Sequence, residues 1–351
     1  MRAARFLGTR NIVITDVPKP EVSGPTDAII RVVRTCVCGS DLWFYRDEKE
    51  SFTGINSPCG HEAIGVVEET GAEVTDFHAG DFVIVPFSFS CGKCPVCKAG
   101  FTSSCPNADF RKGEFLNGAQ GEYVRVSHAD GTLVRIPEGQ YTEEQLASFL
   151  TLSDVMATGY HAAYTAQVKE GDTVAVIGDG AVGLCGVLSA KLMGAKRIIA
   201  MSRHADRQAI ARQFGATDIV AERGAEGEAK ILEMTDGYGV DAVLECVGSQ
   251  QAALTAAKIA RAGAIIGRVG VPHTDGSEYA GLFGRNIGFR GGPASVHFYD
   301  VHEGLVDLVA KGEINPGAVF TKTYTLEDVP QAYKDMDERK VIKAYVKVSE
   351  I

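Results

Sequence analysis

The feature that most constrains the fold of this chain is an alternation of short apolar runs with helical stretches, which begins at about Thr173. The apolar runs have the length of buried strands and lie at Thr173–Ile177, Arg197–Met201, Ile219–Val220, Val240–Glu245 and Ala264–Gly267. The segments between them, such as Ala181–Met193 and Ala205–Phe214, show the helical spacing of apolar residues. Strands that alternate with helices form parallel sheets whose two faces are covered by helices. This part of the chain therefore predicts an α/β domain with a doubly wound parallel sheet.

The first part of the chain has a different pattern. From residue 1 to about 155, β-rich runs such as Ala28–Val33, Ile64–Glu68 and Phe82–Val85 are separated by glycine, proline and aspartate, which is typical of strands and loops. After about Gly291 the alternation weakens, and Tyr324–Val348 resembles the first part again. The two ends of the chain are therefore expected to fold together.

A length of 351 residues is consistent with roughly two domains of about 150 residues each. We expect a β-rich domain from residues 1–155 and 292–351, interrupted by the α/β domain at 156–291. Hydrophobic residues make up 45% of the chain and charged residues 23%, which are globular values that exclude a disordered chain. The net charge of −10 argues against binding to nucleic acid. Since no apolar stretch of about 18 residues and no secretory signal are found, we expect a cytoplasmic protein with no membrane partner.

Four of the nine cysteines form the strongest local signal, at Cys91, Cys94, Cys97 and Cys105. Zn²⁺ prefers tetrahedral thiolate ligands, and a short loop supplies them with little chain entropy to lose. Because four thiolates leave no open position for water, such a site would be structural. The alternatives are four unrelated thiols, two disulfides, or an iron–sulfur cluster, whose usual ferredoxin spacings differ from this one. An odd cysteine count without an export signal favours free thiols or metal ligands over a disulfide framework.

Two further segments contain residue types that bind metals. Cys38 is followed by Gly39, Ser40 and Asp41, and His61 is followed by Glu62. Each segment alone is weak evidence, because a single cysteine or histidine is more often a packed core residue. The pattern around the histidine continues with the residues Gly60, Gly65, Gly71 and Val74.

Together with the cysteine cluster, this string resembles the zinc-containing alcohol dehydrogenase family of medium-chain dehydrogenases, and the resemblance covers nearly the whole chain. It implies a β-rich, GroES-like catalytic domain into which a Rossmann domain is inserted. It also implies two zinc ions per chain, one catalytic and one structural at the four cysteines. The implied reaction is reversible hydride transfer between a nicotinamide cofactor and an alcohol, with its aldehyde or ketone.

By this resemblance Cys38 and His61 would hold the catalytic zinc. The family's third ligand lies just before a Thr-Gly-Tyr or Thr-Gly-Phe element, here Thr158-Gly159-Tyr160, and the matching residue is Asp154. A Cys/His/Asp set departs from the Cys₂His site of alcohol dehydrogenase but matches a variant among bacterial and archaeal secondary-alcohol enzymes. Glu62 would be a partner of these ligands or a transient fourth ligand. The alternative for Asp154 is an ordinary helix cap.

Three protein ligands leave a fourth position on the zinc for alcohol or water. By the resemblance Ser40 would take the alcohol proton; its alternative is a serine that caps a helix beginning near Asp41. Many family members have a histidine five residues after the catalytic cysteine, where this chain has Trp43, which cannot relay a proton. The proton route would then use water, the cofactor ribose or another group such as His161. Phe87 and Trp43 are candidates for narrowing the substrate pocket, and each could equally be a core aromatic residue.

A Gly-x-Gly-x-x-Gly turn follows the first strand of the alternating region, with its glycines at Gly178, Gly180 and Gly183. The first two glycines allow a tight turn and a close approach to a pyrophosphate, and the third lets the helix pack against the strand. The helix begins with Ala181 and Val182, whose N–H groups would face the phosphates. The alternative is that the glycines serve packing only. This turn predicts a dinucleotide site.

The residues that follow the second strand of the alternating region indicate which dinucleotide is bound. A site for NAD would show an acidic residue about twenty residues after the turn, on the ribose hydroxyl. This strand ends instead in Ser202 and Arg203, with Arg207 one turn later, and these could hold a 2′-phosphate through charge-assisted bonds. We therefore expect NADP(H); the alternative is that the arginines are solvated and NAD is accepted. By the resemblance, further cofactor contacts are expected from Thr158, Val269, Val271 and Lys343, the last being either a pyrophosphate ligand or a surface lysine.

Three other functions are open. A polyol or amino-alcohol dehydrogenase could use the same scaffold, since no decisive pocket signature is present. A redox-inactive NADPH-binding sensor or structural protein is opposed by the intact Cys38, His61 and Asp154. A zinc-stapled DNA-binding protein is opposed by the acidic net charge and by the lack of a basic helix. The resemblance implies a homo-oligomer, with a tetramer favoured over a dimer, and it assigns no role to Cys36, Cys59, Cys185 or Cys246.

Overall fold

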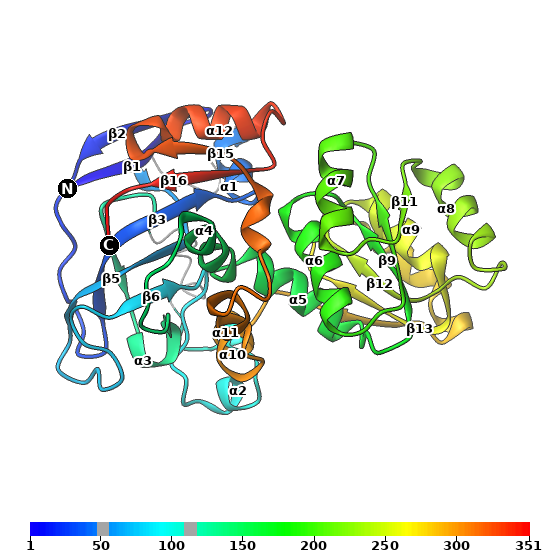
Figure 1. Cartoon of the computed structure of the whole chain (residues 1–351), viewed down its shortest axis with the longest axis horizontal. Coiled ribbons are helices and arrows are strands. Elements are labelled where there is room, and N and C mark those ends of the chain that lie inside the picture. The colour runs from blue at the N-terminus through cyan, green and yellow to red at the C-terminus, as the bar shows by residue number, and fades with distance from the viewer. Residues whose placement is uncertain (48–55, 109–117) are drawn as a thin grey trace. The chain divides into compact units, whose positions relative to one another are not determined.

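The fold comes from a computed structural model, which describes residues 1–47, 56–108 and 118–351. The chain forms two compact units, each with its own core (Figure 1). The first unit comprises Met1–Asp154 and Ser295–Ile351, and the second comprises Val155–Ala294. The second unit thus starts at 155 where 156 was expected, and ends at 294 where 291 was expected.

The second unit is built on a six-stranded sheet in which neighbouring strands run parallel, in the order β11-β10-β9-β12-β13-β14. Its strands are β9 (Thr173–Ile177), β10 (Arg197–Met201), β11 (Asp218–Val220), β12 (Val240–Glu245), β13 (Ala260–Arg268) and β14 (Gly288–Gly291). Its helices are α5 (Val155–Thr165), α6 (Ala181–Leu192), α7 (Ala205–Phe214), α8 (Gly224–Glu233) and α9 (Gln250–Ile259), with 3₁₀ turns η3 (Ser277–Gly281) and η4 (Phe283–Arg285). Figure 1 shows β9 and β12 between α6 and α9, so helices cover both faces of the sheet. This is the doubly wound arrangement expected from the sequence.

The strands of this unit form where the apolar runs predict them. Strands β9, β10 and β12 have the expected bounds, whereas β11 begins one residue earlier and β13 is longer at both ends. The runs are mainly apolar because both faces of their central residues are buried: Val174, Ala175 and Val176 are 0% exposed. Helix α7 ends at Phe214 and is followed by the C-cap residue Gly215, whose φ of 116° is accessible to glycine at low cost.

The first unit contains two sheets. The larger has the order β15-β16-β3-β5-β6-β8, with β7 also paired to β3, and the smaller has the order β2-β1-β4. The strands are β1 (Arg2–Gly8), β2 (Asn11–Asp16), β3 (Ala28–Val37), β4 (Ser57–Pro58), β5 (Ala63–Thr70), β6 (Phe82–Val85), β7 (Tyr123–Val126), β8 (Val134–Arg135), β15 (Phe320–Thr325) and β16 (Lys343–Lys347). Strand β16 pairs antiparallel with β3, which confirms that the two ends of the chain fold together.

The helices of the first unit are short and lie at the ends and sides of its sheets. They are α1 (Asp41–Arg46), α2 (Pro95–Lys98), α3 (Ala129–Thr132), α4 (Glu143–Leu152), α10 (Val296–His302), α11 (Leu305–Ala310) and α12 (Val329–Asp337), with 3₁₀ turns η1 (Thr102–Ser104), η5 (Pro316–Val319) and η6 (Leu326–Asp328). Helix α4 begins at a capping box in which Thr142 and Gln145 each bond the other's backbone N–H, which fixes the helix that precedes Asp154.

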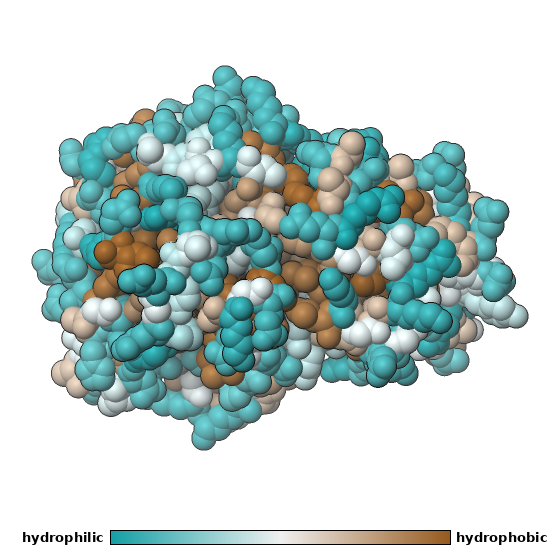
Figure 2. Space-filling model, in the orientation of Figure 1, coloured by the Kyte–Doolittle hydropathy of each residue, from teal (hydrophilic) through white to brown (hydrophobic). Residues whose placement is uncertain are grey.

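One core of the first unit lies under α12, where Tyr333 packs edge-on against Phe6 with ring centroids 5.8 Å apart. On the face seen in Figure 2, hydrophilic residues cover most of the visible surface and hydrophobic residues show only in separate areas. In the described part of the chain, no helix combines the length and the apolar character needed to cross a membrane.

Candidate metal centres and cofactor site

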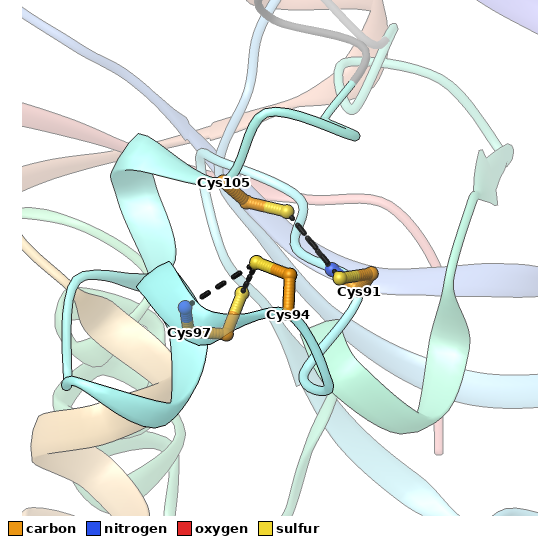
Figure 3. A group of neighbouring side chains, drawn as sticks. All are labelled: Cys91, Cys94, Cys97 and Cys105. Carbon is orange, nitrogen blue, oxygen red and sulfur yellow. Dashed lines mark hydrogen bonds between the residues drawn. The ribbon is translucent and has the colours of Figure 1, made fainter.

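The four clustered cysteines face one another on a single loop (Figure 3). Cys94 and Cys97 have sulfur atoms 3.5 Å apart, and those of Cys91 and Cys105 are 3.6 Å apart. These separations exclude disulfides, whose sulfurs are about 2.05 Å apart. They are close to the roughly 3.8 Å expected between ligands of a tetrahedral zinc site with Zn–S bonds of about 2.3 Å.

Local hydrogen bonds prepare these sulfurs to be thiolates. The backbone N–H of Cys97 donates to Cys94 Sγ, that of Cys91 donates to Cys105 Sγ, and the Asn107 side chain donates to Cys91 Sγ. Burial alone would raise the pKa of Cys91, but the Asn107 and backbone donors outweigh it and lower that pKa to about 6. The loop can tighten because Gly92 adopts a φ of 67°. In the described part of the chain, the four sulfurs converge without another metal-binding side chain in their group, which fits a closed, four-coordinate metal site.

A second cluster brings together the residue types Cys, His, Glu and Asp. Cys38 follows β3, and His61 and Glu62 precede β5, which pairs antiparallel with β3 so that Thr35 faces Ala63. Asp154 lies between α4 and α5. The sheet register therefore places residues that are far apart in sequence at one end of β3 and β5. One donor atom from each of the four residues lies within 4.8 Å of the others.

The side chains of this cluster point toward a common centre. Asp154 Oδ2 lies 3.4 Å from His61 Nε2 and 3.6 Å from Cys38 Sγ. Cys38 and His61 are each 7% exposed and Asp154 is 9% exposed, so the centre is shielded from bulk water on the protein side. A thiol, an imidazole nitrogen and a carboxylate at these separations fit a metal site with three protein ligands and an open position.

Asp41 sets the orientation of the imidazole. Its Oδ1 lies 3.0 Å from His61 Nδ1, which leaves Nε2 facing Cys38 and Asp154. Its Oδ2 accepts hydrogen bonds from the Cys38 backbone N–H and from the Gln120 side chain, at 3.0 and 3.3 Å. Burial opposes a charged His61, but the neighbouring carboxylates Asp41 and Asp154 raise its pKa well above the ordinary value. A buried site that attracts positive charge so strongly suits a divalent cation.

Glu62 and Lys343 form a buried ion pair behind the cluster. Lys343 Nζ lies 2.7 Å from Glu62 Oε1, and both side chains are 1% exposed. The alternative of a surface lysine is therefore wrong. A pyrophosphate contact by Lys343 stays a prediction, and in this structure its ammonium group is directed at Glu62. The other carboxylate oxygen, Glu62 Oε2, is buried without a hydrogen-bond partner in the described chain, as expected of an atom that can turn toward a metal ion.

The Gly-rich turn of the second unit has the geometry that its motif demands. Gly178 adopts a φ of 112°, and Gly180 occupies the N-cap position of α6. A Cβ on Gly183 would lie 2.0 Å from the Gly178 carbonyl oxygen, so the third glycine is required for the strand and helix to pack. The first N–H groups of α6, from Ala181, Val182 and Gly183, precede the helical hydrogen-bonding pattern and are available to an anion.

Of the three residues predicted to bind a 2′-phosphate, Ser202 and Arg203 directly follow β10 and Arg207 lies in the first turn of α7. Ser202 Oγ donates to Asp179 Oδ2 at 2.9 Å, and Arg207 lies 3.2 Å from Asp179 Oδ1. Arg203 is exposed and makes no ion pair with any described residue. Asp179, which stands between the first two glycines of the motif, was not among the predicted site residues.

The remaining predicted cofactor residues lie in the second unit. Val269 follows β13 and its N–H donates to the Glu245 carbonyl, while Val271 is 57% exposed two residues later. Thr158 is buried on α5. His161, on the same helix, is 3% exposed, and burial lowers its pKa to about 4. It is therefore neutral near pH 7.

Comparison with known proteins identifies the family. Residues 24–138 match the model of the alcohol dehydrogenase GroES-like domain, and residues 181–302 match that of the zinc-binding dehydrogenase domain. A zinc-type alcohol dehydrogenase B of Aspergillus flavus is 33% identical over 359 aligned positions, which cover 100% of this chain and 82% of the relative. The chain belongs to the zinc-dependent medium-chain alcohol dehydrogenase family.

Solved structures of other family members agree in fold. The alcohol dehydrogenase TADH from Thermus sp. ATN1 matches with a TM-score of 0.88 and 28% identity, over 99% of this chain and 100% of that one. A zinc-binding dehydrogenase from Sinorhizobium meliloti 1021, bound to NADP, matches with a TM-score of 0.79 and 27% identity, over 99% and 98% of the two chains. The predicted combination of a GroES-like domain and a Rossmann domain is confirmed. The protein is thus a zinc-dependent oxidoreductase of the alcohol dehydrogenase type.

Two positioning residues of this dehydrogenase were not predicted. Asp41 orients His61, and its place three residues after Cys38 is a signal that could have been used. Gln120 bridges Asp41, the Cys36 carbonyl and the Tyr333 hydroxyl. Gln120 has no motif in the sequence, because its partners come together only in the folded sheet. Ser40 stands at the N-cap position of α1 but makes no side-chain cap hydrogen bond, so its hydroxyl is not used in the way the capping alternative requires.

Proposed function

We propose that this chain catalyses reversible hydride transfer between NADP(H) and a primary or secondary alcohol with its aldehyde or ketone. The observation that carries the proposal is the arrangement of Cys38, His61 and Asp154, with the imidazole Nε2 turned toward the thiol and the carboxylate. Such a set supports three bonds to zinc and leaves one position for the substrate oxygen. Zinc bound there would act as a Lewis acid on that oxygen.

The protein's own groups would then have distinct roles. Cys38, His61 and Asp154 hold the metal, Asp41 keeps Nε2 directed at it, and Glu62 is held behind it by Lys343. Ser40 would receive the hydroxyl proton of the alcohol and release its own toward solvent, and a bound nicotinamide ring would accept the hydride from the substrate carbon. One alcohol and NADP⁺ thereby give one carbonyl compound, NADPH and one proton. Cys91, Cys94, Cys97 and Cys105 would hold a second zinc in a structural role.

The cofactor assignment is supported by Ser202 and Arg203 directly after β10 and by Arg207 in the first turn of α7, since no acidic residue stands at the tip of the strand itself. The Sinorhizobium meliloti relative, which is bound to NADP, supports it from outside the chain. Arg203→Ala should lower kcat/KM for NADP⁺ roughly tenfold or more, because a charge-assisted bond to phosphate is lost. If Arg203→Ala keeps the full preference of the wild type for NADPH over NADH, the assignment is wrong.

The activity itself is tested by a turnover screen with NADPH and NADP⁺ over alcohols, aldehydes and ketones, with the Cys38→Ala chain as the blank. We expect zinc-dependent turnover in the wild type and none in the blank. Polyols and amino alcohols belong in the same screen, because turnover confined to them would replace the simple alcohol assignment. Absence of turnover on the whole panel would revive a redox-inactive NADPH-binding role. A homotetramer and a cytoplasmic location stay predictions, and sedimentation of the purified protein tests the first.

A further inference from the structure

Asp179 is a buried acid inside the phosphate-binding turn, between Gly178 and Gly180. Its side chain is 10% exposed and is held on both oxygens. Oδ2 accepts the Ser202 hydroxyl at 2.9 Å, and Oδ1 pairs with Arg207 Nη1 at 3.2 Å. The same Arg207 nitrogen also donates to the Asp179 carbonyl at 3.2 Å. The contact is therefore built from three hydrogen bonds and is not a chance approach of surface charges.

These bonds use two of the three side chains assigned to a 2′-phosphate. Ser202 is 3% exposed, and its carbonyl is further fixed by the Gln208 side chain at 2.7 Å. The Arg207 side chain is 15% exposed. Only Arg203 is exposed and without an ion pair among the described residues. The anion position between Ser202 and Arg207 is thus already filled by a carboxylate of the protein.

We propose that Asp179 determines how strongly the enzyme discriminates between NADP(H) and NAD(H), a proposal that rests on the dinucleotide-dependent function proposed above. In Rossmann sites for NAD, an acid at the tip of the second strand accepts a ribose hydroxyl. This chain lacks that acid on β10, and Asp179 supplies a carboxylate to the same strand tip from the neighbouring turn. An unphosphorylated ribose can donate a hydroxyl to it.

A 2′-phosphate meets two obstacles at Asp179. The phosphate and the Asp179 carboxylate are both negatively charged and repel each other. The phosphate must also compete with the carboxylate for hydrogen bonds from Ser202 and Arg207. Discrimination between two ligands is a difference of binding free energies, and a repulsive group contributes to it as much as an attractive one. Asp179 therefore opposes the preference for NADP(H) that Arg203 favours, and the wild type should use both cofactors to measurable extents.

The test is Asp179→Asn, which removes the charge but keeps an oxygen that can accept the Ser202 hydroxyl. We expect the ratio of kcat/KM for NADP⁺ to kcat/KM for NAD⁺ to rise about tenfold, which is about 1.4 kcal/mol. The dissociation constant of NADPH, measured by fluorescence titration, should fall, and that of NADH should rise. Asp206→Asn is the matched control, because this exposed acid on α7 is one residue from Arg207 and loses the same charge. It should change the ratio by less than about twofold, since exposed charges are screened.

Arg207→Gln provides a second measurement. If Asp179 occupies Arg207, this substitution weakens NADPH binding little in the wild type and much more in the Asp179→Asn background. Additive effects, an unchanged ratio in a folded Asp179→Asn protein, or an equal shift from Asp206→Asn would each overturn the proposal. If the wild type prefers NADH, the proposed preference for NADP(H) is wrong, but the proposal for Asp179 is not affected. The effect of Asp179→Asn is measured as a shift relative to the wild type.

Discussion

Lys343 and Glu62 form a buried ion pair beside the candidate catalytic metal site. Removal of both charges from water is costly, and the pair is maintained by its mutual attraction and by a hydrogen bond from Lys343 to the Val37 carbonyl at 3.3 Å. Burial alone would lower the pKa of Lys343, but Cys36, Glu62 and Cys38 together raise it well above its ordinary value. The raised pKa favours the charged form of Lys343. Burial raises the pKa of Glu62, and the charge of Lys343 opposes that rise.

Lys343→Met should therefore destabilise the protein by about 3–5 kcal/mol, because the Glu62 carboxylate is left buried without its partner. The free energy of unfolding, measured with denaturant on zinc-loaded protein, checks this. Adding Glu62→Gln should recover part of the loss, since the unpaired charge is then gone. Lys19→Met is the matched control: Lys19 and Glu68 are also 2.7 Å apart, but their side chains are 43% and 38% exposed, so the loss should be below about 1 kcal/mol. Equal losses in the two variants would contradict the interpretation.

At the scale of elements, two glycines in the turn between β9 and α6 are needed for different reasons, one for packing and one for cofactor binding. Gly183 permits packing, since a Cβ there would lie 2.0 Å from the Gly178 carbonyl oxygen. Gly180 has no protein atom within 4 Å of the corresponding position and an ordinary φ of −76°, so the fold does not need a glycine there. Its requirement comes from the space that a bound pyrophosphate takes.

Two substitutions separate these uses. Gly183→Ala should lower the free energy of unfolding by about 1–3 kcal/mol, because the strand and helix must move apart. Gly180→Ala should leave stability within about 0.5 kcal/mol or raise it slightly, and should weaken NADPH binding roughly tenfold or more. Thermal denaturation and a fluorescence titration of NADPH report the two effects. A Gly180→Ala protein that binds NADPH normally would show that the turn does not hold the pyrophosphate.

The packing of α12 on β15 includes an acid whose titration affects stability. Asp335 accepts hydrogen bonds from Lys322 and Tyr324, both at 2.7 Å, and its side chain is 4% exposed. The bond from Lys322, with that from Tyr324, lowers the pKa of Asp335 to about 2. A carboxyl group with a lowered pKa stabilises the fold above its unfolded pKa, near 3.8, and this stabilisation is lost as the pH falls toward 2.

Asp335→Asn should therefore lower the free energy of unfolding by about 1.5–3 kcal/mol at pH 6, the usual range for a hydrogen bond to a charged group. The difference in free energy of unfolding between wild type and variant should shrink as the pH is lowered from 4 toward 2. Denaturant titrations at several pH values check both statements. A difference that stays constant over this range would show that the Asp335 charge contributes nothing.

At the scale of the whole molecule, the two metal centres belong to the same unit but are built differently. The four cysteines come from one short loop, whereas Cys38, His61 and Asp154 come from three separate parts of the chain. The loop of the first centre has a small buried cluster, formed by Cys91, Cys97, Cys105 and Ala108, so a metal bound to its four sulfurs would be its main stabilising contact. The second centre depends on the finished sheet.

Metal analysis of three proteins should separate the centres. The wild type should hold two zinc ions per chain, and Cys38→Ala and Cys94→Ser should each hold about one. Cys38→Ala should lose turnover with little change in melting temperature, whereas Cys94→Ser should lower the melting temperature because zinc ligation stabilises the loop. Wild-type protein with a single zinc would remove one of the two assignments, and the variants would show which.

The sequence alone was sufficient to predict those features of this protein that depend on short segments. The strands from Thr173 to Glu245, the glycine turn and the cysteine spacing are contained in short windows, because a buried parallel strand, a phosphate turn and a loop of ligands each have a sequence period or spacing of their own. By contrast, Cys38, His61 and Asp154 could be grouped only through a family resemblance. No local pattern encodes the register that pairs Thr35 with Ala63, so nothing short in the chain says that these residues meet.

Tertiary structure decided the partners of those residues. In the folded chain Asp41 orients His61, and Lys343 is buried against Glu62. Asp179 lies between Ser202 and Arg207. Each of these contacts joins segments whose distance in space depends on sheet order and helix packing. The residue types and their spacing thus determined the kinds of site this protein has, and only the folded chain decided which charges face each other within them.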